Sequence, residues 1–582
     1  MAAWLTVIIG WIVIFALLAG LGQWTQRLIK LPDYTWLGWL DSFWLGYAVS
    51  IAALQAIHLV VPIDWHITAL LGVLGLVALI VCFMRRSSVI SPVISVPQNP
   101  NFKTILLYLC LLLPLIFWLA NRALSPQLDF DSGFYHLSSI KWLNEYPIVP
   151  GLANLHYRLG FNQTIFLLDA ALNAYPYFDH GFTFVNSLLM LVLLAQLLWI
   201  TVRGLFATKS QSVPIMIFAA LLLPICLYRA TPQRFSANLS SPSPDLSVFI
   251  FQILTTLMLL RYLFPTDSPR THNQRFAVLY LLTICAVGVT SKLSFAVFGG
   301  AILLITALHW LWQNRAAWRS AAGWLLRWSL VIGFSLGVVW IARTSILTGY
   351  PLFPNRAAAL SVDFRVPSSI AREAELWVYA FARDPRGDMD RTLSNWDWLG
   401  GWWWRMGDSF NQFLFVIPLY IALAALALLI LAALIALIRH RPLDGRYPLL
   451  ALPALLTCLV WFFSAPDPRF AGAAFWLLVA TLVLGLLNSF PRLSACASIG
   501  ITAYLFVLTI STDFTLRTDF PIIPQPPLQE FRTESGLVYN RSASTQNPLN
   551  LYNASLPNSP YEHPRLTLRG SDLREGFRLP EQ

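Results

Sequence analysis

Residues 412–438 form the run QFLFVIPLYIALAALALLILAALIALI, which contains no charged side chain. About 20 apolar residues are enough to cross a bilayer as a helix, so this run predicts a transmembrane span. Similar runs recur along the chain and account for most of its 582 residues. A composition that is 57% hydrophobic and only 12% charged excludes a soluble enzyme and indicates a membrane protein.

Hydropathy along the whole chain predicts about fourteen spans, so we expect an all-α polytopic membrane protein. The expected spans are residues 3–20, 37–60, 67–84, 104–121, 183–202, 213–229, 246–264, 276–290, 293–312, 324–345, 412–438, 447–465, 471–490 and 493–511. The first run lacks the basic start of a signal peptide, so we expect it to be a retained span. All six cysteines lie in or beside apolar runs, which makes disulfides unlikely to form.

Basic residues indicate the orientation of these spans. If Arg85 and Arg86 are cytoplasmic, alternation places the other basic clusters on the same side, as the positive-inside rule requires. Those clusters are Arg27/Lys30, Arg203/Lys209, Arg270/Arg275, Arg315/Arg319, Arg439/Arg441/Arg446 and Arg492. We therefore expect a multi-pass protein of the bacterial inner membrane with both termini outside. The net charge of +11 then serves topology and lipid headgroups, and no nucleic-acid partner is expected.

The long connections all face outward in this topology, and the first carries an unusual polar cluster. These connections are residues 122–182, 230–245, 346–411 and a tail from about 512. The first contains Asp129-Phe-Asp131-Ser-Gly-Phe-Tyr135-His136 directly after a span. Phe134, Leu137, Ile140 and Leu143 follow at helical spacing and predict an amphipathic helix on the membrane surface. Residues 161–177 are too interrupted by polar side chains to span, so we expect them to stay outside.

Two interpretations of Asp131 are open. Its carboxylate could cap the helix that follows, by accepting hydrogen bonds from exposed backbone N–H groups. It could instead be a general base, because transfer of a sugar from a lipid phosphate needs one carboxylate to take the acceptor's proton. Glycoside hydrolysis needs two such groups, whereas here the phosphate leaves as a stable anion. Asp129 would then bind an acceptor hydroxyl or a divalent ion, or simply be solvated.

The acidic motif resembles the GT-C superfamily of polyprenyl-phosphate-sugar glycosyltransferases. Its protein O-mannosyltransferase and aminoarabinose-transferase branch carries Asp-Glu-x-x-Tyr in the first large outer loop. The segment Asp131-Ser-Gly-Phe-Tyr135 matches the Asp and the Tyr at that spacing, while Ser132 departs from the Glu. The run from Ile140 to Gln163 resembles largely uncharacterised bacterial membrane proteins near that branch. The resemblance covers residues 104–480 in topology and 129–163 in motif.

The resemblance also implies a division of the chain, because the GT-C core begins with the span that leads into this loop. Residues 1–103 would be an N-terminal three-span addition, 104–511 the transmembrane core and 512–582 an outer tail. The tail is polar with scattered apolar residues, so the sequence leaves open whether it folds as a small domain or is partly disordered.

Several cations are expected at the outer surface, where a lipid phosphate needs fixed positive charge. Lys292 and Arg469 lie in tight turns and are the preferred phosphate ligands, with Arg158 as a third. Arg229, Arg234, Asp245 and Arg343 lie at the same depth in the expected topology. Cations at span ends commonly snorkel or cap helices, which is the structural alternative for each of them.

Two other segments have mainly structural interpretations. Tyr350-Pro-Leu-Phe-Pro354-Asn355 predicts a rigid turn. The tryptophans between Trp396 and Trp404 favour an interfacial belt, with a platform for sugar rings as the alternative. His136 and His156 lack a recognisable metal-ligand pattern, so we predict no metal site and no cofactor, although a divalent cation could take part.

We therefore expect a membrane glycosyltransferase that moves a sugar, with inversion, from a polyprenyl-phosphate donor to a glycan, lipid or protein acceptor outside the cell. In this hypothesis Asp131 is the base, assisted by Asp129 and His136. Tyr135, Arg158, Lys292 and Arg469 would bind the substrate. One rival function is a polysaccharide polymerase or ligase that uses a lipid-linked glycan. Another is a lipid or polysaccharide exporter, against which stand the absence of repeats and the shortage of mid-span ionisable groups.

Overall fold

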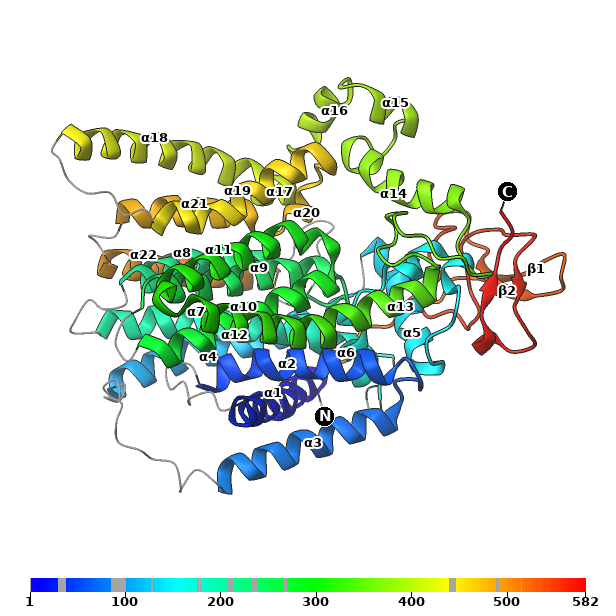
Figure 1. Cartoon of the computed structure of the whole chain (residues 1–582), viewed down its shortest axis with the longest axis horizontal. Helices are drawn as coiled ribbons and strands as arrows, with labels where there is room; N and C mark the ends of the chain where they lie inside the picture. Colours follow the sequence, from blue (N-terminus) through cyan, green and yellow to red (C-terminus); the bar gives the residue numbers. More distant parts are fainter. Residues whose placement is uncertain are drawn as a thin grey trace.

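The computed structural model describes most of the chain and shows a long helical bundle with small strands at one end (Figure 1). The described residues are 2–29, 38–84, 101–126, 129–174, 177, 179–206, 213–231, 239–265, 270–438, 446–487, 491–513 and 515–581. About 72% of the structure is helical, with very little sheet. The all-α class expected from hydropathy is therefore confirmed.

The bundle is built from fifteen helices of ten residues or more, described here with their bounds. They are α1 (Ala3–Leu28), α2 (Gly38–Ile57), α3 (Trp65–Met84), α4 (Phe102–Ala123), α7 (Phe182–Phe206), α8 (Val213–Arg229), α9 (Pro244–Leu263), α10 (Arg270–Ser291), α11 (Ala296–Gln313), α12 (Trp318–Ile332), α13 (Val339–Thr348), α18 (Ile417–Ile438), α19 (Arg446–Ser464), α21 (Ala474–Leu487) and α22 (Pro491–Asp513). A π-helical segment, η7 (Gly333–Val338), joins α12 to α13.

The remaining elements are shorter, apart from the 16-residue helix α14, and most of them lie in the connections. The helices are η2 (Ser132–His136), α5 (Leu137–Glu145), η3 (Leu152–Asn154), η4 (Tyr157–Phe161), α6 (Ile165–Leu172), η5 (Leu293–Phe295), η6 (Arg315–Ala317), α14 (Ser368–Arg383), α15 (Met389–Ser394), α16 (Trp398–Arg405), α17 (Ser409–Asn411), η8 (Gln412–Val416), α20 (Pro468–Ala471) and η9 (Leu573–Glu575). The strands are β1 (Leu528–Arg532), β2 (Val538–Ser542), β3 (Thr567–Leu568) and β4 (Phe577–Arg578). Antiparallel pairs form between β1 and β2 and between β3 and β4.

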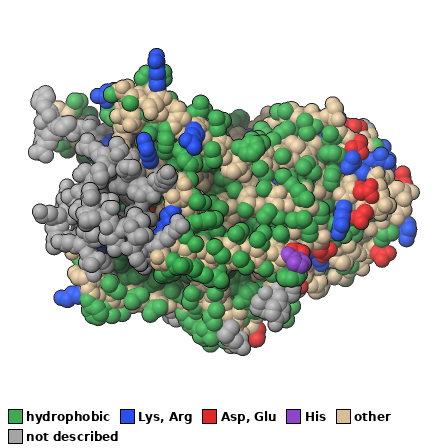
Figure 2. All heavy atoms as spheres, turned by 60° about the horizontal axis from the view of Figure 1, so that its bottom comes forward, with side chains coloured by type: hydrophobic (Ala, Val, Ile, Leu, Met, Phe, Trp, Pro, Cys, Tyr) green, Lys and Arg blue, Asp and Glu red, His purple; other side chains and the backbone are tan. Residues whose placement is uncertain are grey.

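Eleven helices among the described residues are long and apolar enough to cross a membrane. The three remaining expected spans fall on shorter apolar helices, namely α8, α21 and residues 496–508 of α22. A broad apolar surface covers the middle of the molecule, and most carboxylate side chains in view gather at one end (Figure 2). The chain is thus a multi-pass membrane protein, and the count of fourteen spans stays a prediction.

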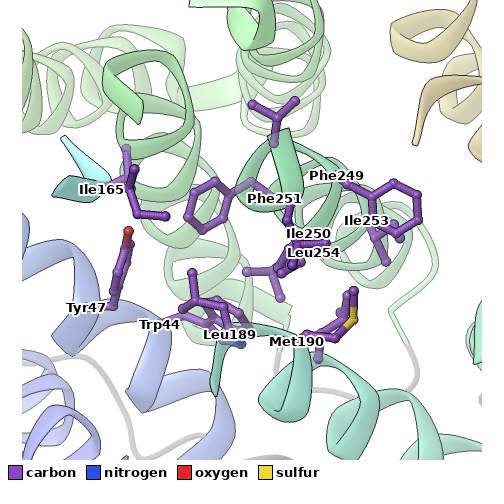
Figure 3. Packing of buried hydrophobic residues seen from close by; sticks show 14 of the residues in the cluster. Trp44, Tyr47, Ile165, Leu189, Met190, Phe249, Ile250, Phe251, Ile253 and Leu254 are labelled. Carbon is purple, nitrogen blue, oxygen red and sulfur yellow. The ribbon is translucent and has the colours of Figure 1, made fainter. Parts of the chain in front are cut away.

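The first two helices are locked together by glycines and then packed into the bundle. A Cβ at Gly22 would lie 1.8 Å from the Ser42 carbonyl oxygen, and one at Gly46 would lie 1.7 Å from the Leu18 carbonyl oxygen. Small residues allow such close helix contacts in membranes. Trp44 of α2 packs beside Phe251 of α9 (Figure 3). The N-terminal helices therefore belong to the bundle core, while the proposed division at residue 103 stays a prediction.

Both chain termini lie at the same end of the bundle. The Ala3 backbone N–H donates to the Thr518 carbonyl oxygen over 2.7 Å, which joins the start of α1 to the segment after α22. Residues 129–174, 349–411 and 515–581 lie at this end, which we call the long-loop end (Figure 1). This arrangement matches the expected alternation, whereas the side of the membrane that it faces stays a prediction.

The expected amphipathic helix forms, but it does not lie on the membrane surface. It consists of η2 and α5, and its apolar positions Phe134, Leu137, Ile140 and Leu143 are all buried within the protein. That part of the prediction is wrong because α6 and the C-terminal segment cover the helix. With eight residues, α6 is about 12 Å long and too short to span a bilayer.

The C-terminal segment, residues 515–581, folds against this first loop. The backbone N–H groups of Leu551 and Tyr552 both donate to the Gly133 carbonyl oxygen, over 2.7 and 2.9 Å. The Ser138 hydroxyl donates to the Asn558 side-chain oxygen over 3.0 Å. The sequence left the tail open between a folded domain and partial disorder, and the structure shows a folded segment held by the loop.

Gly133 should be essential for this docking. A Cβ at position 133 would lie 2.8 Å from Cζ of Tyr552, so Gly133→Ala overpacks the contact, at a cost of about 1–3 kcal/mol. We expect trypsin to cleave residues 515–581 of this variant faster in detergent, and a second change, Tyr552→Ala, to restore protection. Gly300→Ala is the matched control, because nothing lies within 4 Å of its Cβ position. Unchanged proteolysis of Gly133→Ala would contradict the contact.

Candidate active site at the long-loop end

Five of the seven predicted site residues line one cavity of about 410 Å³. They are Asp131, Tyr135, Arg158, Lys292 and Arg469. They come from the first loop, from the turn between α10 and α11, and from α20, so the fold brings together residues up to 338 positions apart. We call this space the inner cavity. Its described lining does not include Asp129 or His136.

Asp131 pairs with a cation and does not cap a helix. Its backbone is helical, with φ −64° and ψ −25°, and its side chain makes no capping hydrogen bond. Instead its Oδ2 accepts a hydrogen bond from Nη1 of Arg469 over 3.3 Å. The capping interpretation of Asp131 is therefore wrong. Asp129 is the local hydrogen-bond acceptor, because its Oδ1 lies 3.3 Å from the Asp131 backbone nitrogen.

Arg469 is held between two carboxylates. It lies in α20, whose first turn is fixed by the Asp467 side chain accepting from the Arg469 backbone N–H over 3.1 Å. The Nε atom of Arg469 also lies 3.5 Å from Oδ2 of Asp467. Arg469 therefore contacts Asp131 and Asp467 at once, whereas its role as a phosphate ligand stays a prediction. Its side chain remains 28% exposed and can still meet a ligand.

The charges at the site set the protonation of the two aspartates in opposite directions. Burial alone would raise the pKa of Asp131, but the guanidinium groups of Arg469 and Arg158 outweigh it and hold the pKa below its ordinary value. Burial and the nearby charge of Asp131 raise the pKa of Asp129 to about 7. Asp131 is therefore ionised at neutral pH, whereas Asp129 is partly protonated.

Arg158 is surrounded by aromatic rings. Its guanidinium carbon lies 4.7 Å from the ring centre of Trp377, and four other rings lie within 6 Å: Phe134, Tyr135, Tyr157 and Phe161. Such faces attract a cation and hold its plane in place. Asp131 also stabilises the charged form, and the pKa of Arg158 is raised despite its burial. The site therefore contains a permanent cation that no carboxylate neutralises by direct contact in the described structure.

Lys292 begins the turn between α10 and α11 and pairs with Asp245 at the start of α9. Its ammonium group also lies 4.8 Å from the ring centre of Phe470. Asp245 was expected at this depth, but its pairing with Lys292 was not. Lys292 thus lines the inner cavity with its charge already partnered.

The remaining predicted residues take supporting positions. His136 is buried and its Nδ1 has no hydrogen-bond partner, and burial lowers its pKa to about 4. It is therefore neutral at physiological pH. Asp129 also accepts from the Ser241 hydroxyl over 3.4 Å. Among the described residues, no group of three His, Cys, Asp or Glu side chains could hold a metal ion.

Arg343 and Arg229, two other cations expected at this depth, do not line the inner cavity among the described residues. Arg343 donates to Nδ1 of His58 over 2.7 Å and to the Asn162 side chain over 3.1 Å. Arg229 lies 5.2 Å from the ring centre of Phe410. Arg234 lies outside the described residues.

Sequence reasoning missed several residues of the site. Gln163, Glu375 and Tyr379 also line the inner cavity, and Trp377 packs on Arg158. Gln163 ends the run from Ile140 that carries the family resemblance, so the resemblance could have marked it as a site residue. Nothing in the sequence marked Glu375, Trp377 and Tyr379 of α14 as site residues, because a helix far along the chain becomes part of the site only through tertiary packing.

Residues 4–476 match a family described as a domain of unknown function, DUF8201. Because this match covers most of the chain, the protein belongs to that family. The match begins in α1 and ends in α21, so it includes the inner cavity and leaves out the C-terminal segment. No curated protein and no solved structure matches the chain.

The raised pKa of Asp129 predicts a pH-dependent effect on stability. The pKa of this carboxyl group is about 4 in the unfolded chain and about 7 in the folded protein. Between these values the folded state binds more protons, so the contribution of Asp129 to stability falls as pH rises. Asp129→Asn removes the titration. The melting temperature of the variant relative to wild type, measured in detergent, should therefore increase from about pH 4.5 to about pH 7.5.

Asp388→Asn provides the matched control, because Asp388 is an exposed helix cap and Asn caps equally well. Its melting difference from wild type should stay constant over the same range. A constant difference for Asp129→Asn would contradict the assigned protonation.

Proposed function

We propose that this protein is a membrane glycosyltransferase that moves a sugar from a polyprenyl-phosphate donor to an acceptor at the long-loop end, with inversion. The observation that carries the proposal is the inner cavity, where the Asp131 carboxylate meets three cations at the end of an apolar bundle. A lipid phosphate needs such cations at headgroup depth, and an acceptor hydroxyl needs such a carboxylate.

The inner cavity suits a lipid donor because membrane-spanning helices form its apolar wall. Leu293 comes from η5, Val297 from the start of α11, and Val460 and Trp461 from α19. Further along these helices, away from the cavity, large apolar side chains are exposed on the surface: Leu304, Leu308, Leu455 and Leu456. A polyprenyl chain could therefore lie along α11 and α19 with its phosphate among the cations.

The chemistry follows from the position of Asp131. The acceptor oxygen forms a bond to the anomeric carbon of the donor sugar, and its proton passes to the Asp131 carboxylate. The bond from that carbon to the phosphate oxygen breaks, and its electron pair leaves with the phosphate. Attack from the face opposite the phosphate inverts the configuration. Arg158, Arg469 and Lys292 stabilise the negative charge of the leaving phosphate.

The Asp131–Arg469 pair implies an order of events, in which the donor binds before Asp131 takes the proton. An ion-paired carboxylate with a lowered pKa is a weak base. When the donor phosphate binds Arg469, its negative charge competes with Asp131 for the guanidinium and raises the pKa of Asp131. Donor binding thus prepares the base. Asp129 supports this arrangement by accepting from the Asp131 backbone N–H, and neutral His136 is buried beside the rings of Tyr135 and Phe166.

Both rival functions use the same site differently. A polymerase or ligase would take a whole glycan on lipid pyrophosphate, which carries more negative charge and a longer sugar chain than a single-sugar donor. An exporter would need no base, so the ionised Asp131 would have no chemical task. Comparing cell-envelope glycans with and without the gene, by mass spectrometry, separates these functions: missing single sugars support transfer and missing repeat units support polymerisation.

The carboxylate prediction uses the two acids that flank Arg469. Asp131→Asn and Asp467→Asn each remove one negative partner of Arg469, but only the first removes the proposed base. We expect Asp131→Asn to lower sugar transfer from a polyprenyl-phosphate donor in membranes by about 10²–10⁴-fold, the typical contribution of a general base. Asp467→Asn should retain most transfer at saturating donor. Equal losses in both variants would mean that Asp131 acts only through Arg469.

The phosphate prediction concerns Arg158, which can be changed without removing the direct partner of a carboxylate. Arg158→Met keeps an apolar stem among the aromatic rings but removes the charge, whereas Arg158→Lys keeps the charge without the planar group. Donor titrations should show an apparent donor requirement at least about tenfold higher for Met, with Lys intermediate. Arg372→Met, at an exposed position of α14, should leave the titration unchanged. An unchanged requirement in Arg158→Met would remove Arg158 from the phosphate site.

A further inference from the structure

A second and larger cavity, of about 1100 Å³, adjoins the site on the other side of Arg469. Its wall includes Trp403 and Trp404 of α16, followed by Arg405, Asp408, Asn411 and Gln412. We call it the tryptophan cavity. Arg469 lines both cavities, and Asp467 lines this one. A ligand in the tryptophan cavity would therefore be separated from Asp131 by one guanidinium group.

The helix that carries the two tryptophans is held rigidly. Trp402 is buried, and its Nε1–H donates to the Pro466 carbonyl oxygen over 2.6 Å. The Arg405 guanidinium donates to the carbonyl oxygens of Ala382 and Arg383, over 2.9 and 2.7 Å. These bonds tie α16 to α14 and to the turn before α20. Trp403 and Trp404 nevertheless remain 49% and 86% exposed. A fixed helix thus presents two large aromatic side chains that the protein does not cover.

The polar part of this wall is rich in hydrogen-bond acceptors. Asn411 and Gln412 each donate an amide N–H to a backbone carbonyl, Arg405 and Gly407 respectively. Their side-chain oxygens are therefore oriented by the loop and can accept hydrogen bonds. One oxygen of Asp408 accepts from the Phe410 backbone N–H, and a carboxylate has a second oxygen for another donor. Aromatic faces beside several oxygen acceptors match a sugar ring, which has apolar C–H faces and hydroxyl donors.

An interfacial aromatic belt is the structural alternative for these tryptophans. It explains exposed indole rings, but it does not require a cavity whose wall combines two carboxylates, two amides and the guanidinium of Arg469. The lipid requirement is already met by the inner cavity between α11 and α19. Most of the lining of the tryptophan cavity comes from connecting segments, and Phe410, Asn411, Gln412 and Val416 come from α17 and η8, at the start of the candidate span that continues into α18.

We propose that the tryptophan cavity binds a carbohydrate acceptor, with Trp403 and Trp404 stacking on its sugar rings and Asp408, Asn411 and Gln412 accepting hydrogen bonds from its hydroxyls. The acceptor role rests on the proposed transferase function, whereas carbohydrate binding in this cavity does not. The acceptor of the reaction is then a glycan and not a protein or a simple lipid. Its reacting hydroxyl would pass Arg469 to reach Asp131.

The test measures binding by the full-length protein in lipid nanodiscs, without any donor. The probes are four defined hexasaccharides, namely cellohexaose, mannohexaose, maltohexaose and N-acetylchitohexaose, monitored by saturation-transfer NMR. Wild type should bind at least one of them saturably. Trp404→Ala should weaken that binding about tenfold, the loss expected from one stacking contact of about 1.4 kcal/mol, and Trp404→Phe should weaken it less. Trp312→Ala is the matched control, because Trp312 is also exposed but lies at the end of α11 that is far from the inner cavity.

Brominated lipids, which quench tryptophan fluorescence on contact, give the opposing result for an aromatic belt. We expect quenching to fall in Trp312→Phe and to stay nearly unchanged in Trp404→Phe. The proposal is overturned if no hexasaccharide binds wild type, or if Trp404→Ala leaves binding intact. A loss of quenching in Trp404→Phe equal to that in Trp312→Phe would also overturn it. If a hexasaccharide binds but no polyprenyl-phosphate sugar is transferred, the proposed function fails while the carbohydrate site stands.

Discussion

The ion pair between Asp131 and Arg469 is the constraint around which the long-loop end is organised. A carboxylate and a guanidinium that are shielded from bulk water are expected to pair, because the desolvation free energy of either charge alone is unfavourable. The two residues lie 338 positions apart, so the pair fixes the first loop against α20. Asp467, the N-cap residue of α20, is the second carboxylate that pairs with Arg469. The same ion pair therefore determines both the charge arrangement of the site and the packing of this end.

The C-terminal segment adds a second constraint on the same loop. Its two N–H groups bind the Gly133 carbonyl oxygen, two residues after Asp131, and the ring of Tyr552 lies against Gly133. The segment thus restrains the π-helical turn that follows Asp131, although it lines neither cavity in the described structure. It lies outside the region that matches the family. The described tail therefore supports the position of the site without contributing to its surface.

The sequence predicts local properties of this protein well and pairwise contacts poorly. Each expected span falls on a helix because hydropathy is a local property that the bilayer selects directly. Alternation of the spans placed Asp131, Arg158, Lys292 and Arg469 at one end, and the structure brings all four to one cavity. The capping interpretation, one of the two left open for Asp131, is wrong because the choice between a backbone partner and Arg469 depends on residues far along the chain. The pairing of Lys292 with Asp245 and the aromatic surroundings of Arg158 were hidden for the same reason.

Two cavities that share one guanidinium suit a reaction between two different molecules. The inner cavity has apolar walls from spanning helices, whereas the tryptophan cavity combines the aromatic rings of α16 with oxygen acceptors at the start of a candidate span and just before it. A lipid and a glycan would therefore be sorted by solvent preference before they meet. Arg469 lies where both would arrive, and its charge is balanced by Asp131 and Asp467. In the proposed reaction, an anionic donor that draws this guanidinium toward itself would release Asp131 at the boundary that the acceptor must cross, so the displacement that secures the donor would also expose the base to the second substrate.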